Sequence, residues 1–240
     1  MICKEMHGLN ANQIKFIAIT AMAIDHIASV FFSGSPMTWY AFGMHIIGRL
    51  TAPIMWFFIA EGCYYTSDKK RYLGRLFFFA VISHFAYCFA FRRPLLPLSS
   101  GYTNQTSVMW PLALSAVLIF VVQSEKIRMP VKILTGSLVC LAAFPADWSF
   151  IAVMCPLFLF LHRNRFRRQA ADIIIWSVIC ALGYFLFIDR TYGIIQLFTF
   201  LTIPVLYRYN GERGKWKGMK WFFYIFYPAH LFLLGLIKVL

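Results

Sequence analysis

Charged side chains are scarce in this sequence, and acidic ones are the scarcest. Only 13% of the 240 residues are charged, about half the share that is usual in soluble domains, whereas 60% are hydrophobic and the mean hydropathy is +0.68. A water-soluble domain of this size needs more charge on its surface. The composition therefore excludes an ordinary soluble protein and predicts a polytopic membrane protein in a lipid bilayer.

Cysteine motifs and processing signals are missing as well. The six cysteines form no Cys-x-x-Cys pair, and five lie inside apolar runs; they are Cys3, Cys63, Cys88, Cys140, Cys155 and Cys180. This pattern excludes a disulfide framework and a cysteine metal site, and we expect no metal. The first apolar run is too long for a secretory signal peptide and no small-residue cleavage motif follows it, so we expect it to remain as the first span.

The sequence also lacks internal repeats, linkers and low-complexity tracts, so we predict a single domain over residues 1–240. Its apolar runs lack the alternation of a membrane β-barrel, and the predicted fold is an all-α transmembrane helical bundle. We expect about nine spans, at residues 14–32, 44–65, 73–91, 107–123, 131–143, 148–162, 170–188, 192–207 and 220–239. The fifth, sixth and eighth are short for a helix that crosses a bilayer upright.

Basic residues alternate between the connections that join these spans. Eighteen of the 23 Lys and Arg residues, Lys4 and Lys15 included, fall on one side, and five fall on the other. Cytoplasmic loops are the ones that carry an excess of Lys and Arg, so the N-terminus is predicted to be cytosolic. The formal net charge of +14 thus reflects topology, and no nucleic-acid partner is expected.

The first span carries Asp25 and His26 well inside its apolar run. A carboxylate in hydrocarbon costs about 2.5–3.5 kcal/mol on insertion scales, so such a group faces a protein interior, a cavity or a partner. Arg49 lies at a similar depth in the second span, which allows an Asp25–Arg49 ion pair between helices. His45 is four residues before Arg49, on the same helix face. The plain alternative is that this ion pair is structural only.

The second span has further unusual positions. Glu61 lies twelve residues after Arg49, roughly 18 Å along a helix, so the two cannot pair. Gly48 and the kink expected at Pro53 would let another helix or a ligand approach the backbone.

Polar residues also occur in later segments. His84 lies near the middle of the third span, and Tyr227 and His230 share a face of the last one. The two histidines either line a site or are core residues that form hydrogen bonds between helices. Asp147 and Asp189, in short outer connections, either close a cavity or serve as helix N-caps.

Histidine is the side chain best suited to proton transfer near neutral pH, and His26 is the expected general base. Asp25 is about 100° away from His26 around the helix, so we expect it to act through a partner on the second span. Arg49 would hold Asp25, a developing oxyanion or a donor phosphate. No Ser or Cys stands in a recognisable nucleophile motif, so we expect direct transfer without a covalent enzyme intermediate.

A set of short motifs resembles the TraX family. They are Asp25-His26, Ile47-Gly48-Arg49-Leu50, Pro53, Ala60-Glu61-Gly62, Lys69-Lys70-Arg71-Tyr72 and Tyr227-Pro228-x-His230. The resemblance is detailed over roughly the first ninety and the last twenty residues, and the middle matches mainly in hydropathy.

The resemblance implies a multi-pass inner (cytoplasmic) membrane acetyltransferase with acetyl-CoA as donor. The family is associated with N-terminal acetylation of conjugative pilin and is distantly similar to membrane acyltransferases that act on sugars. The acceptor would be an amine or hydroxyl of a peptide, pilin or cell-surface glycan, and an oligomer is allowed. The expected site comprises His26, Asp25 and Arg49 as catalytic residues and Glu61, His84, Tyr227 and His230 as substrate-binding residues.

Two other classes stay open. The same titratable residues would serve a proton-coupled transporter or permease, although the chain lacks the internal repeat that many secondary transporters have. A non-catalytic membrane assembly factor for a surface structure would need the ion pair only for its fold.

Overall fold

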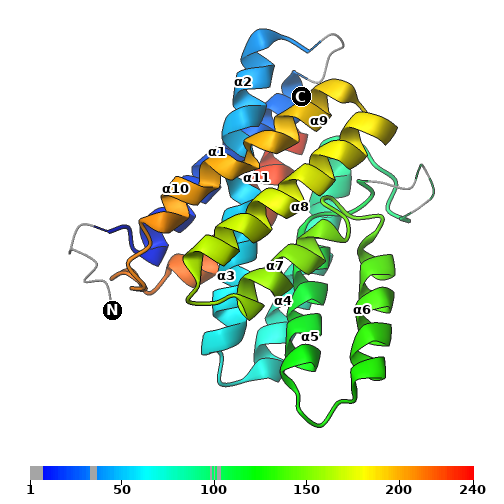
Figure 1. The fold of residues 1–240 in the computed structure, drawn as a ribbon. Helices are drawn as coiled ribbons and strands as arrows, with labels where there is room; N and C mark the ends of the chain where they lie inside the picture. The colour runs from blue at the N-terminus through cyan, green and yellow to red at the C-terminus, as the bar shows by residue number, and fades with distance from the viewer. Residues whose placement is uncertain (1–7, 33–36, 98, 100, 102–103) are drawn as a thin grey trace. The chain divides into compact units, whose positions relative to one another are not determined.

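The structure, a computed structural model, describes residues 8–32, 37–97, 99, 101 and 104–240 (Figure 1). Cys3 and Lys4 lie outside these residues. Within the described part of the chain every regular element is a helix, and strand-like pairing is limited to two isolated bridges, Leu9–Tyr209 and Thr106–Ala146. The predicted all-α fold is confirmed.

Most helices follow one another with short connections, whereas residues 92–108 and 208–218 form longer ones. In chain order they are α1 (Ala11–Phe31), α2 (Trp39–Gly48), α3 (Thr51–Tyr65), α4 (Lys69–Phe91), α5 (Met109–Gln123), α6 (Met129–Ala143), α7 (Ile151–Leu161), α8 (Phe166–Phe187), α9 (Arg190–Leu197), the 3₁₀ helix η1 (Phe198–Leu201), α10 (Thr202–Tyr207) and α11 (Met219–Val239). Each of the nine predicted segments is thus helical.

Length separates these helices into two groups. Among the residues that the structure describes, five helical stretches are long and apolar enough to cross a membrane: Ala11–Phe31, Trp39–Tyr65, Lys69–Phe91, Phe166–Phe187 and Met219–Val239. Helices α5, α6 and α7 are apolar but have only 15, 15 and 11 residues, and the eighth segment is divided into α9, η1 and α10. The count of nine spans and the cytosolic N-terminus stay predictions.

The second predicted span is interrupted about one turn before Pro53, as a proline inside a helix predicts. Helix α2 ends at Gly48 and α3 begins at Thr51. Pro53 has no N–H to offer the carbonyl of Arg49, four residues earlier, and its ring would clash with that carbonyl. The kink expected at Pro53 therefore appears at Arg49 and Leu50, between α2 and α3.

The chain forms two compact units, and each is described by itself. Unit 1 comprises residues 1–55 and 173–226. In it, α1 buries Ile14, Ala18 and Met22, which are four residues apart and form one stripe. Asn10 and Gln13 form a capping box at the start of α1, which satisfies backbone donors there.

Unit 2 comprises residues 56–172 and 227–240. Its central helix is α5, which is buried almost all round and contacts α4, α6 and α7. An apolar helix that is buried on every side belongs to a core. Helix α6 is the opposite case, because Leu134, Leu138 and Leu141 are all more than half exposed. Such exposed leucines indicate contact with lipid.

Candidate functional site

The predicted ion pair between Asp25 and Arg49 is present in unit 1. Arg49 Nη2 lies 2.8 Å and 2.9 Å from the two carboxylate oxygens of Asp25. Both side chains are largely shielded, with 15% of Asp25 and 9% of Arg49 exposed. A carboxylate and a guanidinium this close offset much of the cost of placing either charge in an apolar segment.

Asp25 also binds the side chain of a histidine on the second span, His45. His45 Nδ1 lies 2.8 Å from Asp25 Oδ1, and His45 is 1% exposed. Arg49 is the residue that caps α2, and its Nε donates a 3.2 Å hydrogen bond to the His45 carbonyl. A carboxylate on Nδ1 fixes the ring orientation and leaves Nε2 as the second functional atom. The site therefore contains a histidine–carboxylate pair.

Gly48 makes this arrangement sterically feasible. A Cβ atom at this position would overlap the Asp25 side chain, so α1 and α2 approach through the space that glycine leaves open. The sequence prediction that Gly48 permits close approach is confirmed, and the group that approaches is the candidate catalytic carboxylate.

Helix α9 completes the cluster with two neutral polar side chains. Gln196 Oε1 accepts a 3.0 Å hydrogen bond from Arg49 Nη1, and Gln196 is 2% exposed. The Tyr192 hydroxyl lies 3.4 Å from His45 Nε2. Asp189 is the N-cap of α9, where it accepts from the Tyr192 backbone N–H at 2.8 Å, so the N-cap alternative for Asp189 is confirmed.

Gln196 is held in place by two buried hydroxyl groups, those of Thr199 and Ser177. Thr199 Oγ1 donates a 2.7 Å hydrogen bond to the Gln196 carbonyl and also bonds to the Ser177 hydroxyl of α8. Thr199 and Ser177 are 0% and 2% exposed. Buried networks in which each polar group has a partner hold their members in one arrangement. Arg49 is therefore held through both of its Nη atoms, Nη1 by Gln196 and Nη2 by Asp25.

The sequence predictions missed His45, Tyr192 and Gln196 as site residues. The available signal for His45 was its spacing of four from Arg49, which places both on one helix face. Tyr192 and Gln196 are uncharged and lie in a segment that reads as one short span. Their contribution depends on the break between α9 and α10, for which Pro204, four residues after Phe200, was the available signal.

His26 follows Asp25 on α1 and is 9% exposed. The expectation that Asp25 acts on the second span is confirmed by its contacts with His45 and Arg49. The role of His26 as general base stays a prediction.

Glu61 belongs to unit 2, where it binds the arginine that follows α7. Arg163 Nε lies 2.8 Å from Glu61 Oε1, and Arg163 Nη2 donates to Glu61 Oε2 at 3.3 Å and to the Tyr65 hydroxyl at 2.8 Å. The guanidinium also lies 3.5 Å above the Tyr64 ring centroid. Burial is the largest single influence and lowers the pKa of Arg163, but the hydrogen bond to Glu61 and the nearby negative charge together outweigh burial and raise this pKa above its usual value. Arg163 is one of the eighteen basic residues whose predicted role was only to mark the cytoplasmic side.

The remaining predicted residues also lie in unit 2. Both ring nitrogens of His84 have partners at 2.8 Å, the Thr106 hydroxyl and the Leu95 carbonyl, which favours the structural alternative for this histidine. The rings of Tyr227 and His230 are 5.8 Å apart, so these two residues do share a face. Their roles in substrate binding stay predictions.

A second histidine–carboxylate pair was not foreseen. His162 Nδ1 lies 2.7 Å from Asp172 Oδ2, where α7 ends and α8 begins. Of the described residues, no group of three or more His, Cys, Asp or Glu side chains is placed to hold a metal ion.

Comparisons with known proteins agree with the resemblance seen in the motifs. The family model described as "TraX protein" matches residues 10–238. The chain is 31% identical over 236 residues to "Probable fimbrial assembly protein FimC, serogroup H1" of Dichelobacter nodosus, an alignment that covers 94% of each chain. No solved structure matches the chain. The family match and the apolar helices together establish that this multi-pass membrane protein belongs to the TraX family.

Proposed function

We propose that the chain is an inner-membrane acetyltransferase. It would move an acetyl group from acetyl-CoA to an amine or hydroxyl of a fimbrial subunit or a cell-surface glycan. Membership of the TraX family and the fimbrial name of its relative support a role in surface structures. The single observation that carries the chemistry is the 2.8 Å contact between His45 Nδ1 and Asp25, made inside apolar helices.

His45 would act as the general base in place of the predicted His26. With its Nδ1 proton donated to Asp25, the neutral ring presents an unprotonated Nε2. The acceptor nitrogen or oxygen bonds to the acetyl carbonyl carbon as the carbon–sulfur bond of the thioester breaks. The acceptor's proton passes through Nε2 to the leaving thiolate, which gives the acetylated acceptor and free CoA. The Tyr192 hydroxyl lies 3.4 Å from Nε2, on the side from which the acceptor would approach.

Arg49 would act as a positioning residue. Its Nε binds the His45 carbonyl, its Nη1 binds Gln196 and its Nη2 binds Asp25. Because all three nitrogens already have protein partners, the side chain is better placed to keep Asp25 ionised than to bind a donor phosphate. An ionised Asp25 in turn stabilises the imidazolium that forms during proton transfer.

A non-catalytic assembly factor is the second candidate, and the name of the relative favours it. In that case the Asp25–His45–Arg49 cluster would only hold α1 against α2. The two candidates differ in whether acetyl-CoA is consumed.

Radiolabelled acetyl-CoA separates them. Membranes with the wild-type chain and membranes without it are incubated with the donor, a synthetic fimbrial-subunit peptide and a glycan fraction. The proposal expects label in one acceptor, or release of free CoA, only with the wild-type chain. Absence of both, while the purified chain still binds the fimbrial subunit, would favour the assembly factor.

A further inference from the structure

We infer that a groove between α6 and α7 in unit 2 binds one acyl chain of an anionic phospholipid. This inference is independent of the proposed acetyl transfer. It rests on the shape of the groove, on the side chains that line it and on the charges at one end.

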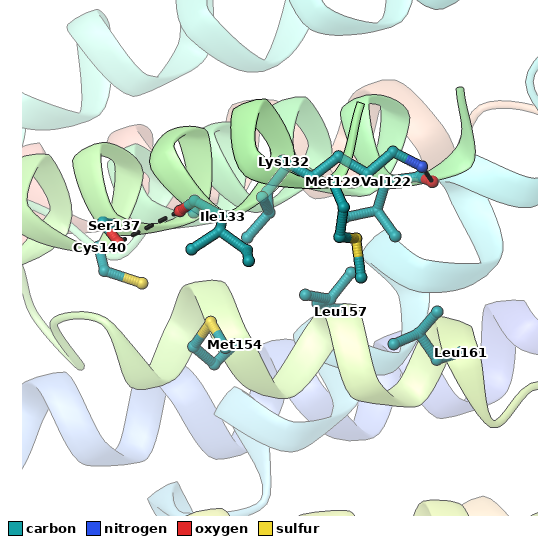
Figure 2. Close-up of a pocket in the computed structure, with 11 residues that line it drawn as sticks. Val122, Met129, Lys132, Ile133, Ser137, Cys140, Met154, Leu157 and Leu161 are labelled. Atoms are coloured by element: carbon teal, nitrogen blue, oxygen red, sulfur yellow. Dashed lines mark hydrogen bonds between the residues drawn. The ribbon is translucent and has the colours of Figure 1, made fainter. Parts of the chain in front are cut away.

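The groove has a volume of about 550 Å³, within the range of roughly 300–1,000 Å³ that is common for small-molecule sites. Figure 2 shows Met129 and Ile133 of α6 on one side and Met154, Leu157 and Leu161 of α7 on the other. All five side chains are apolar, and such a lining suits a hydrocarbon ligand.

Helices α6 and α7 both pack on α5, and small residues on α6 leave open space between α6 and α7. This space is the groove. Helix α6 is tied to α5 at both ends: Lys132 Nζ donates to the Val122 carbonyl at 2.8 Å, and Trp110 Nε1 donates to the Ala142 carbonyl at 3.1 Å. Between these ties α6 presents small side chains to the groove, namely Gly136, Ser137 and Cys140. The Ser137 hydroxyl donates to the Ile133 carbonyl of its own helix, so this polar group needs no partner in the groove (Figure 2).

The dimensions favour an alkyl chain over a peptide helix. From Met129 to Cys140 the groove follows eleven residues of α6, roughly 16 Å. A helix of that length and about 10 Å in width would occupy roughly 1,200 Å³ and could not lie wholly inside the groove. An extended acyl chain is narrow enough to lie along the whole groove.

The charges at the Met129 end favour an anionic headgroup. Lys126 and Arg128 are exposed in the α5–α6 turn, and Lys132 lines the groove itself; Glu125 is the acidic residue of the same turn. Lys132 uses one of its three ammonium donors on Val122, which leaves two for a phosphate. Juxtamembrane basic residues attract anionic lipids.

Native mass spectrometry of the full chain in detergent tests the inference. Phosphatidylglycerol and phosphatidylcholine with identical acyl chains are added to the wild type, to Ser137→Phe and to Lys132→Ala. Matched controls are Leu138→Phe, which adds the same ring on the exposed face of α6, and Lys217→Ala in unit 1.

The wild type should retain phosphatidylglycerol about fivefold better than phosphatidylcholine, the effect of one basic residue near the headgroup. Ser137→Phe should lose both lipids, Lys132→Ala should retain both with a weaker preference because Lys126 and Arg128 remain, and both controls should resemble the wild type. Retention by Ser137→Phe equal to the wild type, or a wild type without preference, would overturn the inference. A wild-type dimer that Ser137→Phe dissociates would instead assign the groove to a second copy of the chain.

Should Ser137→Phe fail to fold, a phospholipid with a photoreactive acyl chain replaces it. Cross-links on the wild-type chain should then map to Met154 or Cys140. Cross-links confined to the exposed leucines of α6 would contradict the groove as the binding site.

Discussion

At the scale of single residues, the Asp25 carboxylate joins two helices through His45 and Arg49. The substitution Asp25→Asn keeps its shape but removes its charge, and Arg49 is then left in an apolar segment without a counter-charge. Breaking a buried pair in this way costs about 3–5 kcal/mol. We expect Asp25→Asn and Arg49→Gln each to lower the thermal unfolding temperature of the chain in micelles.

The double variant decides whether the two residues act as a pair. Asp25→Asn/Arg49→Gln should unfold at a higher temperature than the sum of the single effects predicts, because neither charge is then left alone. Strictly additive effects would contradict the pair.

Gly48 gives a second prediction at this scale. In Gly48→Ala the new methyl group overlaps Asp25 and should separate α1 from α2, so stability and acetyl transfer should both fall. Gly43→Ala is the matched control in the same helix, because nothing lies within 4 Å of its Cβ position. That control should be neutral or more stable by about 1 kcal/mol, since alanine favours helix over glycine. Equal effects of the two substitutions would contradict the close approach at Gly48.

The contact between Asp25 and Arg49 was predictable, because an unpaired charge in an apolar run needs a partner at its own depth. Which of two histidines, His26 or His45, would contact Asp25 was not predictable. The suitability of histidine for proton transfer pointed to His26 of the first span, whereas the structure brings His45 to the carboxylate from the next helix. Sequence spacing fixes the angle between Asp25 and His26 but does not show which face of α2 approaches α1.

At the scale of helices, the continuity of the apolar runs predicted where helices occur, since a membrane-embedded chain must satisfy its own backbone. Their interruptions were harder to predict. Pro53 indicated a break, and the structure places it at Arg49 and Leu50. Pro204 is the comparable signal for the break between α9 and α10, because it has no N–H for the carbonyl of Phe200 in η1, and the sequence prediction missed it. Helix α9 supplies Gln196 and Tyr192 to the site.

Helix α9 is therefore predicted to be a positioning element. Gln196→Leu removes the acceptor of Arg49 Nη1 and leaves a buried donor without a partner, which costs about 1–3 kcal/mol. We expect kcat for acetyl transfer to fall while the KM for acetyl-CoA changes little. Gln123→Leu, which removes an exposed contact with Lys69, is the control and should leave both constants unchanged. An unchanged kcat in Gln196→Leu would show that α9 does not support the site.

At the scale of the whole molecule, the distribution of basic residues makes a topological prediction. Reporter fusions at the N-terminus and cysteine labelling in the α3–α4 and α7–α8 connections should report cytosolic locations. Labelling at residues 145–149 should report the opposite side. A cytosolic reading at residues 145–149 as well as in the α7–α8 connection would mean that the 11-residue helix α7 does not cross the membrane.

The central claim is that the histidine held by Asp25 performs the proton transfer. Acetyl transfer from labelled acetyl-CoA by His45→Ala and His26→Ala, measured at equal amounts of folded protein, tests it most directly. The account predicts that His45→Ala loses about 10²–10⁴-fold in rate, the range typical of a general base, and that His26→Ala loses far less. A His45→Ala variant with wild-type rate, or a loss confined to His26→Ala, would contradict it.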